Sequence, residues 1–164
     1  MSEHVVDVSW SRGEHEFTYD TYNRDHEWRF DGGITVPGSA NPKYLGNPGP
    51  VDPEEAFVAA LSSCHMLTFL AIAARKRLVV DAYDDHAVGV MAKNDAGRLA
   101  ITQLTLNPTI VWSGPEPDAG TLERLHHLAH QECFIANSVT TEVTVADGNQ
   151  VVAEGKQKPP AGPA

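Results

Sequence analysis

The stretch DPEEAFVAALSSCHML, residues 52–67, decides how the rest of the chain is organised. Asp52 is a good N-cap residue. Pro53 suits the first helical position, because its missing N–H would have no intrahelical partner there. Glu55 follows Asp52 by three residues, as in a capping box, and adds negative charge at the positive end of the helix dipole. The sequence therefore predicts a helix that begins at Pro53.

This helix is expected to be buried on most of its surface. Residues 56–74 are apolar nearly all round, and the run closes with Arg75-Lys76-Arg77. One small sheet does not easily cover such a helix, so we expect a homodimer with the helix at its centre; a helix sandwiched inside one subunit is the alternative. The run is near the length of a membrane span, but its Ser, Thr, His and Cys residues make it only weakly hydrophobic, and no membrane partner is predicted.

Length and charge narrow the class of protein. With 164 residues, the chain is expected to form a single domain over residues 1–154, followed by a disordered tail over 155–164. Its 12 basic and 22 acidic residues give a net charge of −10, which argues against nucleic acid and anionic membranes as partners. The N-terminus lacks a basic region followed by an apolar one, so a cytoplasmic location is expected.

The other elements follow from the apolar pattern. Alternating apolar residues predict strands on both sides of the helix, at about 6–10, 17–21, 28–30, 34–36, 79–80, 88–92, 99–112, 139–145 and 151–152. A slip in phase between Ile101 and Leu104 predicts a β-bulge, and Pro108 predicts an edge position or a second irregularity. A second helix is predicted from about Asp118 to Cys133. This order indicates an α+β fold with a mainly antiparallel sheet.

The two cysteines fall on the two predicted helices, Cys64 inside the first and Cys133 at the end of the second. Each suits the role of a small buried residue. In a reducing compartment, a pairing between them would be catalytic or redox-sensing rather than structural. A reactive thiol needs a nearby cation or a helix N-terminus, and position alone does not choose among four candidate cations: Arg24, Arg29, His26 and His65.

A metal site is a competing interpretation. His126, His130 and Cys133 have i, i+4, i+7 spacing, and Cys64-His65 could complete a set of zinc ligands. However, His126 and His130 fall at the rim of the apolar stripe, where solvated histidines are common. We therefore expect no metal.

Two segments resemble the OsmC/Ohr superfamily of osmotically induced and organic-hydroperoxide-resistance proteins. The first is the Val51–Glu55 helix start with Cys64 ten residues after Glu54, the family's spacing for the reactive cysteine. The second is CFIANS, residues 133–138, which matches the family's C-P-Y-S-N-like run loosely, without its Pro and with Asn137 one place late. Arg24 precedes Pro42 by 18 residues, as in the hydroperoxide-resistance branch. The resemblance covers residues 5–146.

The resemblance implies an OsmC-like fold, an intertwined homodimer and a thiol peroxidase without metal or haem. Cys64 would be the peroxidatic thiolate, stabilised by Arg24, which Glu54 would hold by a bidentate bond. Cys133 would resolve the Cys64 sulfenic acid to a disulfide, and a small dithiol or a lipoylated protein would reduce that disulfide. Apolar residues, Trp28, Phe57 and Phe134 among them, suit an organic hydroperoxide as substrate.

His26 and His65 depart from the family pattern. Both are candidate substrate-binding residues, which would deliver a proton to the leaving alkoxide or indicate a substrate other than a hydroperoxide. The alternative is that they are satisfied polar residues at a dimer seam. The same thiols also fit a second class of function, a redox-sensing or sulfur-handling binding protein with little peroxidase turnover.

Overall fold

The computed structural model describes residues 1–147 and 150–153, with side chains for residues 1–146. The chain divides into two compact units, here called the N-terminal unit (residues 1–57) and the C-terminal unit (from residue 58), and each is described by itself. The expectation of a single domain over residues 1–154 stays a prediction. The tail predicted to be disordered lies outside the described residues.

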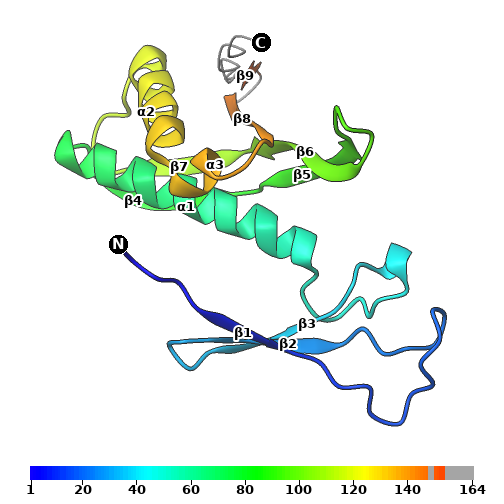
Figure 1. The fold of residues 1–164 in the computed structure, drawn as a ribbon. Helices are drawn as coiled ribbons and strands as arrows, with labels where there is room; N and C mark the ends of the chain where they lie inside the picture. The colour runs from blue at the N-terminus through cyan, green and yellow to red at the C-terminus, as the bar shows by residue number, and fades with distance from the viewer. Residues whose placement is uncertain (148–149, 154–164) are drawn as a thin grey trace. The chain divides into compact units, whose positions relative to one another are not determined.

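The N-terminal unit is built on a three-stranded antiparallel sheet. Its strands are β1 (Val6–Ser9), β2 (His26–Phe30) and β3 (Thr35–Gly38), in the order β1-β2-β3 (Figure 1). A turn follows β2, and Gly33 takes a φ of 83° there, which a glycine adopts without a steric cost. A short 3₁₀ helix, η1 (Pro42–Tyr44), lies in the Pro- and Gly-rich loop after β3.

The strand predicted at residues 17–21 is wrong. The carbonyl of Thr18 accepts hydrogen bonds from the backbone N–H groups of Thr21 and Tyr22, so this stretch is a turn. Phe17 packs against the rings of Trp10 and Tyr22, at centroid distances of 5.9 and 5.8 Å. The aromatic residues that resembled a strand pattern instead form a ring cluster.

The long helix α1 (Pro53–Arg75) begins and ends as predicted. The backbone N–H of Glu55 donates to Asp52 Oδ1 (2.8 Å) and the N–H of Asp52 donates to Glu55 Oε2 (3.1 Å), which confirms the capping box. At the other end Arg77 has a φ of 61°, and the N–H of Leu78 donates to the carbonyl of Ala73 (3.0 Å), a Schellman motif.

Two sheets form in the C-terminal unit. β4 (Val80–Asp85) pairs with β7 (Pro108–Trp112), and the second sheet has the order β5-β6-β8-β9: Val88–Lys93, Leu99–Leu106, Glu142–Asp147 and Gln150–Ala153. All these pairings are antiparallel except β6 with β8. The bulge is confirmed, because Val90 pairs with Gln103 and Met91 with Ile101, which leaves Thr102 without a partner residue.

The single long strand predicted over residues 99–112 is two strands in two different sheets. The break falls at Asn107, whose backbone N–H donates to Asp85 Oδ1 (2.7 Å) instead of continuing the β6 ladder. Pro108, which has no N–H to donate, begins β7. The irregularity expected at Pro108 is therefore a change of sheet.

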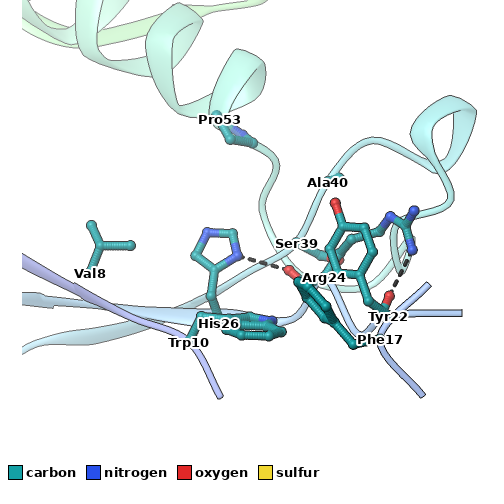
Figure 2. Close-up of a pocket in the computed structure, with 9 residues that line it drawn as sticks. All are labelled: Val8, Trp10, Phe17, Tyr22, Arg24, His26, Ser39, Ala40 and Pro53. Carbon is teal, nitrogen blue, oxygen red and sulfur yellow. Dashed lines mark hydrogen bonds between the residues drawn. The ribbon is translucent and has the colours of Figure 1, made fainter. Parts of the chain in front are cut away.

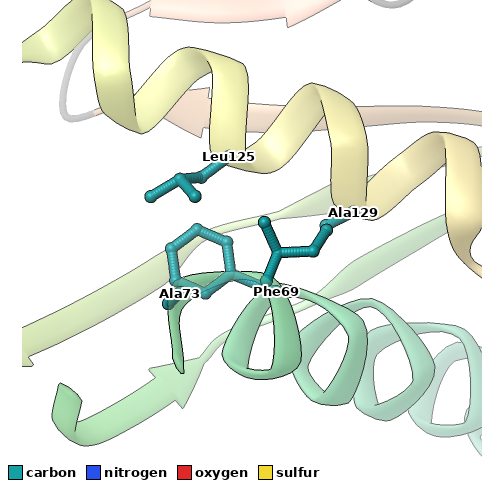
Figure 3. Packing of buried hydrophobic residues seen from close by; sticks show 5 residues of the cluster. Phe69, Ala73, Leu125 and Ala129 are labelled. Carbon is teal, nitrogen blue, oxygen red and sulfur yellow. The ribbon is translucent and has the colours of Figure 1, made fainter. Parts of the chain in front are cut away.

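Helix α2 (Ala119–Glu132) has Asp118 as its N-cap and is followed by the short helix α3 (Phe134–Asn137). Leu125 and Ala129 of α2 face Phe69 and Ala73 of α1 in the core of this unit (Figure 3). Partly buried residues of β4 and β7 pack against the same cluster. One face of the C-terminal half of α1 therefore packs against α2 and a sheet.

Within the part of the chain that the structure describes, α1 is buried on one face, at Leu61, His65, Phe69, Ile72 and Ala73. On the other side Leu67 is 62% exposed, among exposed small residues at 59, 60, 63, 71 and 74. By length and composition alone α1 could also cross a membrane, a test that core helices of soluble proteins pass as well. The homodimer expected to cover this face stays a prediction.

Candidate functional site

A cavity of about 560 Å³ opens in the N-terminal unit, where β2 begins. Figure 2 shows the side chains that line it: Val8, Trp10, Phe17, Tyr22, Arg24, His26, Ser39, Ala40 and Pro53. Its size is typical of small-molecule sites, and most of its wall is aromatic or aliphatic. The cavity brings together two residues that the sequence singled out, Arg24 and His26.

Arg24 is buried and held by its own loop. Its guanidinium donates to the carbonyls of Tyr22 (2.7 Å) and Tyr19 (2.5 Å) and lies over the Tyr22 ring, 3.9 Å from its centroid. Cation–π contact and two hydrogen bonds therefore replace the expected partner. Within the described residues, no ion pair joins Arg24 to Glu54, so the predicted bidentate bond is absent from this conformation.

His26 is positioned by β2 and β3. Its Nδ1 lies 2.9 Å from the carbonyl of Arg24 and donates to it, since a carbonyl only accepts. Gly38 pairs with His26 across the two strands, and a Cβ at Gly38 would lie 2.5 Å from His26 Nε2. The ring therefore occupies the space that glycine leaves, and its Nε2 is the nitrogen left for a bound molecule.

Three aromatic residues of the cavity were missed by the sequence interpretation: Trp10, Phe17 and Tyr22. The signal was the number of aromatic residues in the segment before Arg24, which was interpreted as strands and turns. Trp28 and Phe57, predicted to bind substrate, are not among the residues that line this cavity; the Trp28 ring lies beside that of His26, with a centroid distance of 5.8 Å.

The C-terminal unit holds both cysteines as free thiols. Cys64 on α1 is partly exposed. Cys133 is fully buried, and it caps the end of α2 and the start of α3, where its Sγ accepts from the N–H of Ala136 (3.4 Å). Burial raises the pKa of the Cys133 thiol to about 11, the Ala136 N–H opposes this rise, and the neighbouring Cys64 thiol adds to it. The two sulfur atoms are therefore neighbours in different environments.

His65 is not among the residues that line the cavity of the N-terminal unit. It is 1% exposed, and its Nε2 lies 3.1 Å from Nδ1 of His126 on α2. Burial, together with the neighbouring His126 and His130, lowers its pKa to about 3. His65 is thus a neutral core residue rather than a cation beside Cys64. Phe134, by contrast, is 81% exposed at the start of α3.

The expectation that His126 is solvated is also wrong, since it is 8% exposed. The buried face of α2 is wider than its apolar pattern indicated. His126, at the edge of that face, is buried because His65 on α1 is its polar partner. Among residues 1–147 and 150–153, no three or more His, Cys, Asp or Glu side chains are grouped as a metal ion requires.

Comparisons with known proteins give the family of this chain. The sequence matches the family described as OsmC-like protein over residues 46–146. The chain belongs to the OsmC-like protein family. A solved structure of an OsmC-like protein of unknown function from Vibrio cholerae, VCA0330, is 51% identical, with a TM-score of 0.85, and covers 89% of this chain and 99% of that one.

More distant solved structures share the fold of this OsmC-like chain. An organic hydroperoxide resistance protein OsmC from Legionella pneumophila is 14% identical, with a TM-score of 0.65 and coverage of 88% and 94%. A putative organic hydroperoxide resistance protein from Vibrio cholerae with captopril in one active site is 17% identical, with a TM-score of 0.69 and coverage of 93% and 96%. No curated protein matches the sequence.

Proposed function

We propose that this OsmC-like protein is a thiol-dependent peroxidase that reduces organic hydroperoxides. The observation that carries the proposal is the pair of neighbouring free thiols, one partly exposed and the other buried with a raised pKa. Such a pair suits the two steps of a two-cysteine cycle. The exposed thiol reaches the peroxide, and the buried thiol reacts only with the neighbouring cysteine. Relatives of the same fold that are described as organic hydroperoxide resistance proteins support it.

In the proposed cycle the Cys64 thiolate attacks the distal oxygen of ROOH. The S–O bond forms as the O–O bond breaks, and the alkoxide leaves as ROH after taking a proton. Cys133 then attacks the sulfenic acid, the S–S bond forms and water leaves. A small dithiol, or a lipoylated protein, reduces the disulfide by exchange and is itself oxidised to a disulfide.

Arg24 and Glu54 have supporting roles in this proposal. Arg24 would stabilise the thiolate and the charge that develops on the peroxide, and Glu54 would orient Arg24. In the present conformation the guanidinium is engaged by two carbonyls, so it must exchange these contacts for the Glu54 carboxylate. Replacing Arg24 by Gln is expected to slow peroxide reduction by about 10²-fold.

The aromatic cavity gives the proposal its substrate class. Trp10, Phe17 and Tyr22 suit an aryl or alkyl body, and His26 Nε2 suits one polar group of the substrate. This supports an organic hydroperoxide over hydrogen peroxide. The proposed enzyme acts as a cytoplasmic homodimer, in which the exposed face of α1 is covered by the second copy.

A second candidate is a redox-sensing or sulfur-handling protein with little turnover. The engagement of Arg24 by backbone carbonyls favours it, because an arginine that stays there activates no thiolate. The two functions differ in turnover rather than in the first oxidation.

The deciding experiment adds one equivalent of cumene hydroperoxide to the reduced protein and follows intact mass. A peroxidase loses two hydrogens, Cys133→Ser gains one oxygen at Cys64, and Cys64→Ser is unchanged. Unchanged mass of the wild type under excess hydroperoxide overturns the proposal. Steady consumption of hydroperoxide with dihydrolipoamide supports the enzyme, whereas one oxidation without turnover supports the sensor.

A further inference from the structure

His65 and His126 form a buried polar pair inside an apolar core. The planes of the two rings are 9° apart, and the nitrogen atoms at 3.1 Å are closer than the ring centroids at 5.4 Å, so the rings meet edge to edge. Phe69 packs on His126 at a centroid distance of 4.5 Å. Nδ1 of His65 has no hydrogen-bond partner among the described residues. Burying an unsatisfied polar atom costs free energy that two apolar side chains would avoid. The presence of two histidines here therefore needs an explanation.

The donor in this pair follows from the unpartnered atom. If His126 Nδ1–H donated, His65 would carry its proton on Nδ1, as a buried N–H group without an acceptor. If His65 Nε2–H donates to His126 Nδ1, only a lone pair stays unsatisfied. We therefore assign His65 Nε2–H as the donor and His126 Nδ1 as the acceptor.

The hydrogen bond joins the two helices that carry the cysteines. His65 directly follows Cys64 on α1, and His126 stands seven residues before Cys133, the residue that caps α2. Elsewhere the α1–α2 contact is apolar and includes small residues, Ala73 and Ala129, and such contacts have no directional preference of their own. A hydrogen bond is directional and fixes a register.

We propose that the His65–His126 hydrogen bond is a positioning device, which holds α1 against α2 in the register that brings the Cys64 and Cys133 thiols together. Neither histidine touches the substrate. The inference rests on the proposed function only in taking the Cys64–Cys133 disulfide as a working state of the protein. A register shift of one ångström between the helices is enough to slow such a step strongly.

The chain offers variants that separate positioning from stability. His126→Asn keeps an acceptor near the Nδ1 position, and His65→Gln keeps a donor near the Nε2 position. His126→Leu leaves the His65 N–H unsatisfied and lowers stability. The double variant His65→Leu/His126→Leu removes both polar groups, and stability is expected to return to at least part of its wild-type value.

The test uses diamide on the reduced full-length protein. Diamide takes two electrons and two protons from the thiols as the disulfide forms, so it needs no peroxidase activity. The rate of disulfide formation is followed by intact mass, and stability by urea unfolding. We expect the double Leu variant to unfold near the wild-type midpoint yet to form the disulfide about tenfold more slowly or worse, and His126→Asn to stay within about threefold of the wild type.

A wild-type rate in the double Leu variant overturns the inference, and so do rates that simply follow stability across all variants. If the double variant does not fold, His126→Asn against His126→Leu decides in the same way. A wild type that forms the disulfide with diamide but does not react with hydroperoxide overturns the proposed function and leaves this comparison intact. A wild type that forms no disulfide with diamide overturns the inference.

Discussion

His65 Nε2 and His126 Nδ1 lie 3.1 Å apart in a core that leaves neither ring more than 8% exposed. A neutral imidazole can share one proton in such a contact, but two imidazolium rings cannot remain there. Burial, with the neighbouring His126 and His130 as smaller causes, lowers the pKa of His65 from 6.5 to about 3. Protonation of His65 is therefore coupled to unfolding.

The first prediction is that stability falls as the pH drops below about 6.5. Between pH 6.5 and 3 the unfolded chain binds a proton at His65 that the folded chain does not, so the free energy of unfolding rises with pH in that window and levels off above it. The limiting slope from this one group is about 1.4 kcal/mol per pH unit. Urea unfolding at pH 7.5, 6.0 and 5.0 measures it.

The control for this prediction is the exposed residue His86 in the same unit. His65→Gln should flatten the dependence between pH 7.5 and 5.0, because the titrating group is gone, whereas His86→Gln should keep the wild-type slope. Equal slopes in His65→Gln and the wild type would show that His65 does not carry the effect.

The second prediction concerns the order in which the thiols react. Cys133 is fully buried and its pKa is raised to about 11, so only about one molecule in 10⁴ carries the thiolate at pH 7. Cys64 is partly exposed. Iodoacetamide at pH 7 should therefore label Cys64 well before Cys133, as read by peptide mass spectrometry.

Unfolding the protein in urea should bring the two labelling rates together, since the difference arises from the fold. Labelling of Cys133 in the native protein should rise as the pH approaches 11. Equal labelling of both cysteines in the native protein at pH 7 would contradict the assignment of Cys133 as the protected thiol.

The third prediction is that Gly38→Ala changes ligand binding while the protein stays folded. The new Cβ would lie 2.5 Å from His26 Nε2, so the imidazole must rotate out of its place in the cavity wall. A side chain can move aside at little cost in stability, unlike backbone. We expect a raised KM for cumene hydroperoxide and a thermal midpoint near that of the wild type.

Gly32→Ala is the matched control, since a Cβ there meets nothing within 4 Å. It should leave both the KM and the midpoint unchanged. If Gly38→Ala also leaves the KM unchanged, His26 does not contact the hydroperoxide, and the assignment of this cavity to the substrate fails.

Local signals in the sequence predicted the ends of α1 and the β-bulge correctly. The capping box at Asp52, the helix end near Arg75 and the bulge before Leu104 each depend on residues close together in the chain. The change of sheet at Pro108 was harder to predict from the sequence. A proline indicates a break in a ladder, but the partner that accepts the Asn107 N–H comes from Asp85, far away in sequence.

The residues of the candidate site were likewise predicted only in part. The family spacing selected Cys64 and Cys133, and the structure makes them neighbours. It did not predict the His65–His126 contact, because helical periodicity places each histidine on a face without showing which residue lies opposite. The aromatic wall of the cavity was missed for the related reason that Phe17 and Tyr22 come from a turn, where no periodicity applies.

The last prediction tests the residue on which α1 starts. Asp52 Oδ1 accepts from the N–H of Glu55 (2.8 Å), and its Oδ2 accepts from Nδ2 of Asn41 (2.8 Å) in the preceding loop. Asp52→Ala removes both contacts in a place that is 5% exposed, and it should cost about 1–2 kcal/mol of unfolding free energy. Asp52→Asn keeps an acceptor for the Glu55 N–H but offers an amide to Asn41 where the wild type offers an oxygen, so its loss should be smaller. Urea unfolding of both variants separates the cap from the loop contact. If Asp52→Asn loses as much as Asp52→Ala, the bond to Asn41 rather than the helix cap is the main contribution of Asp52, and the capping box is not what stabilises the start of α1.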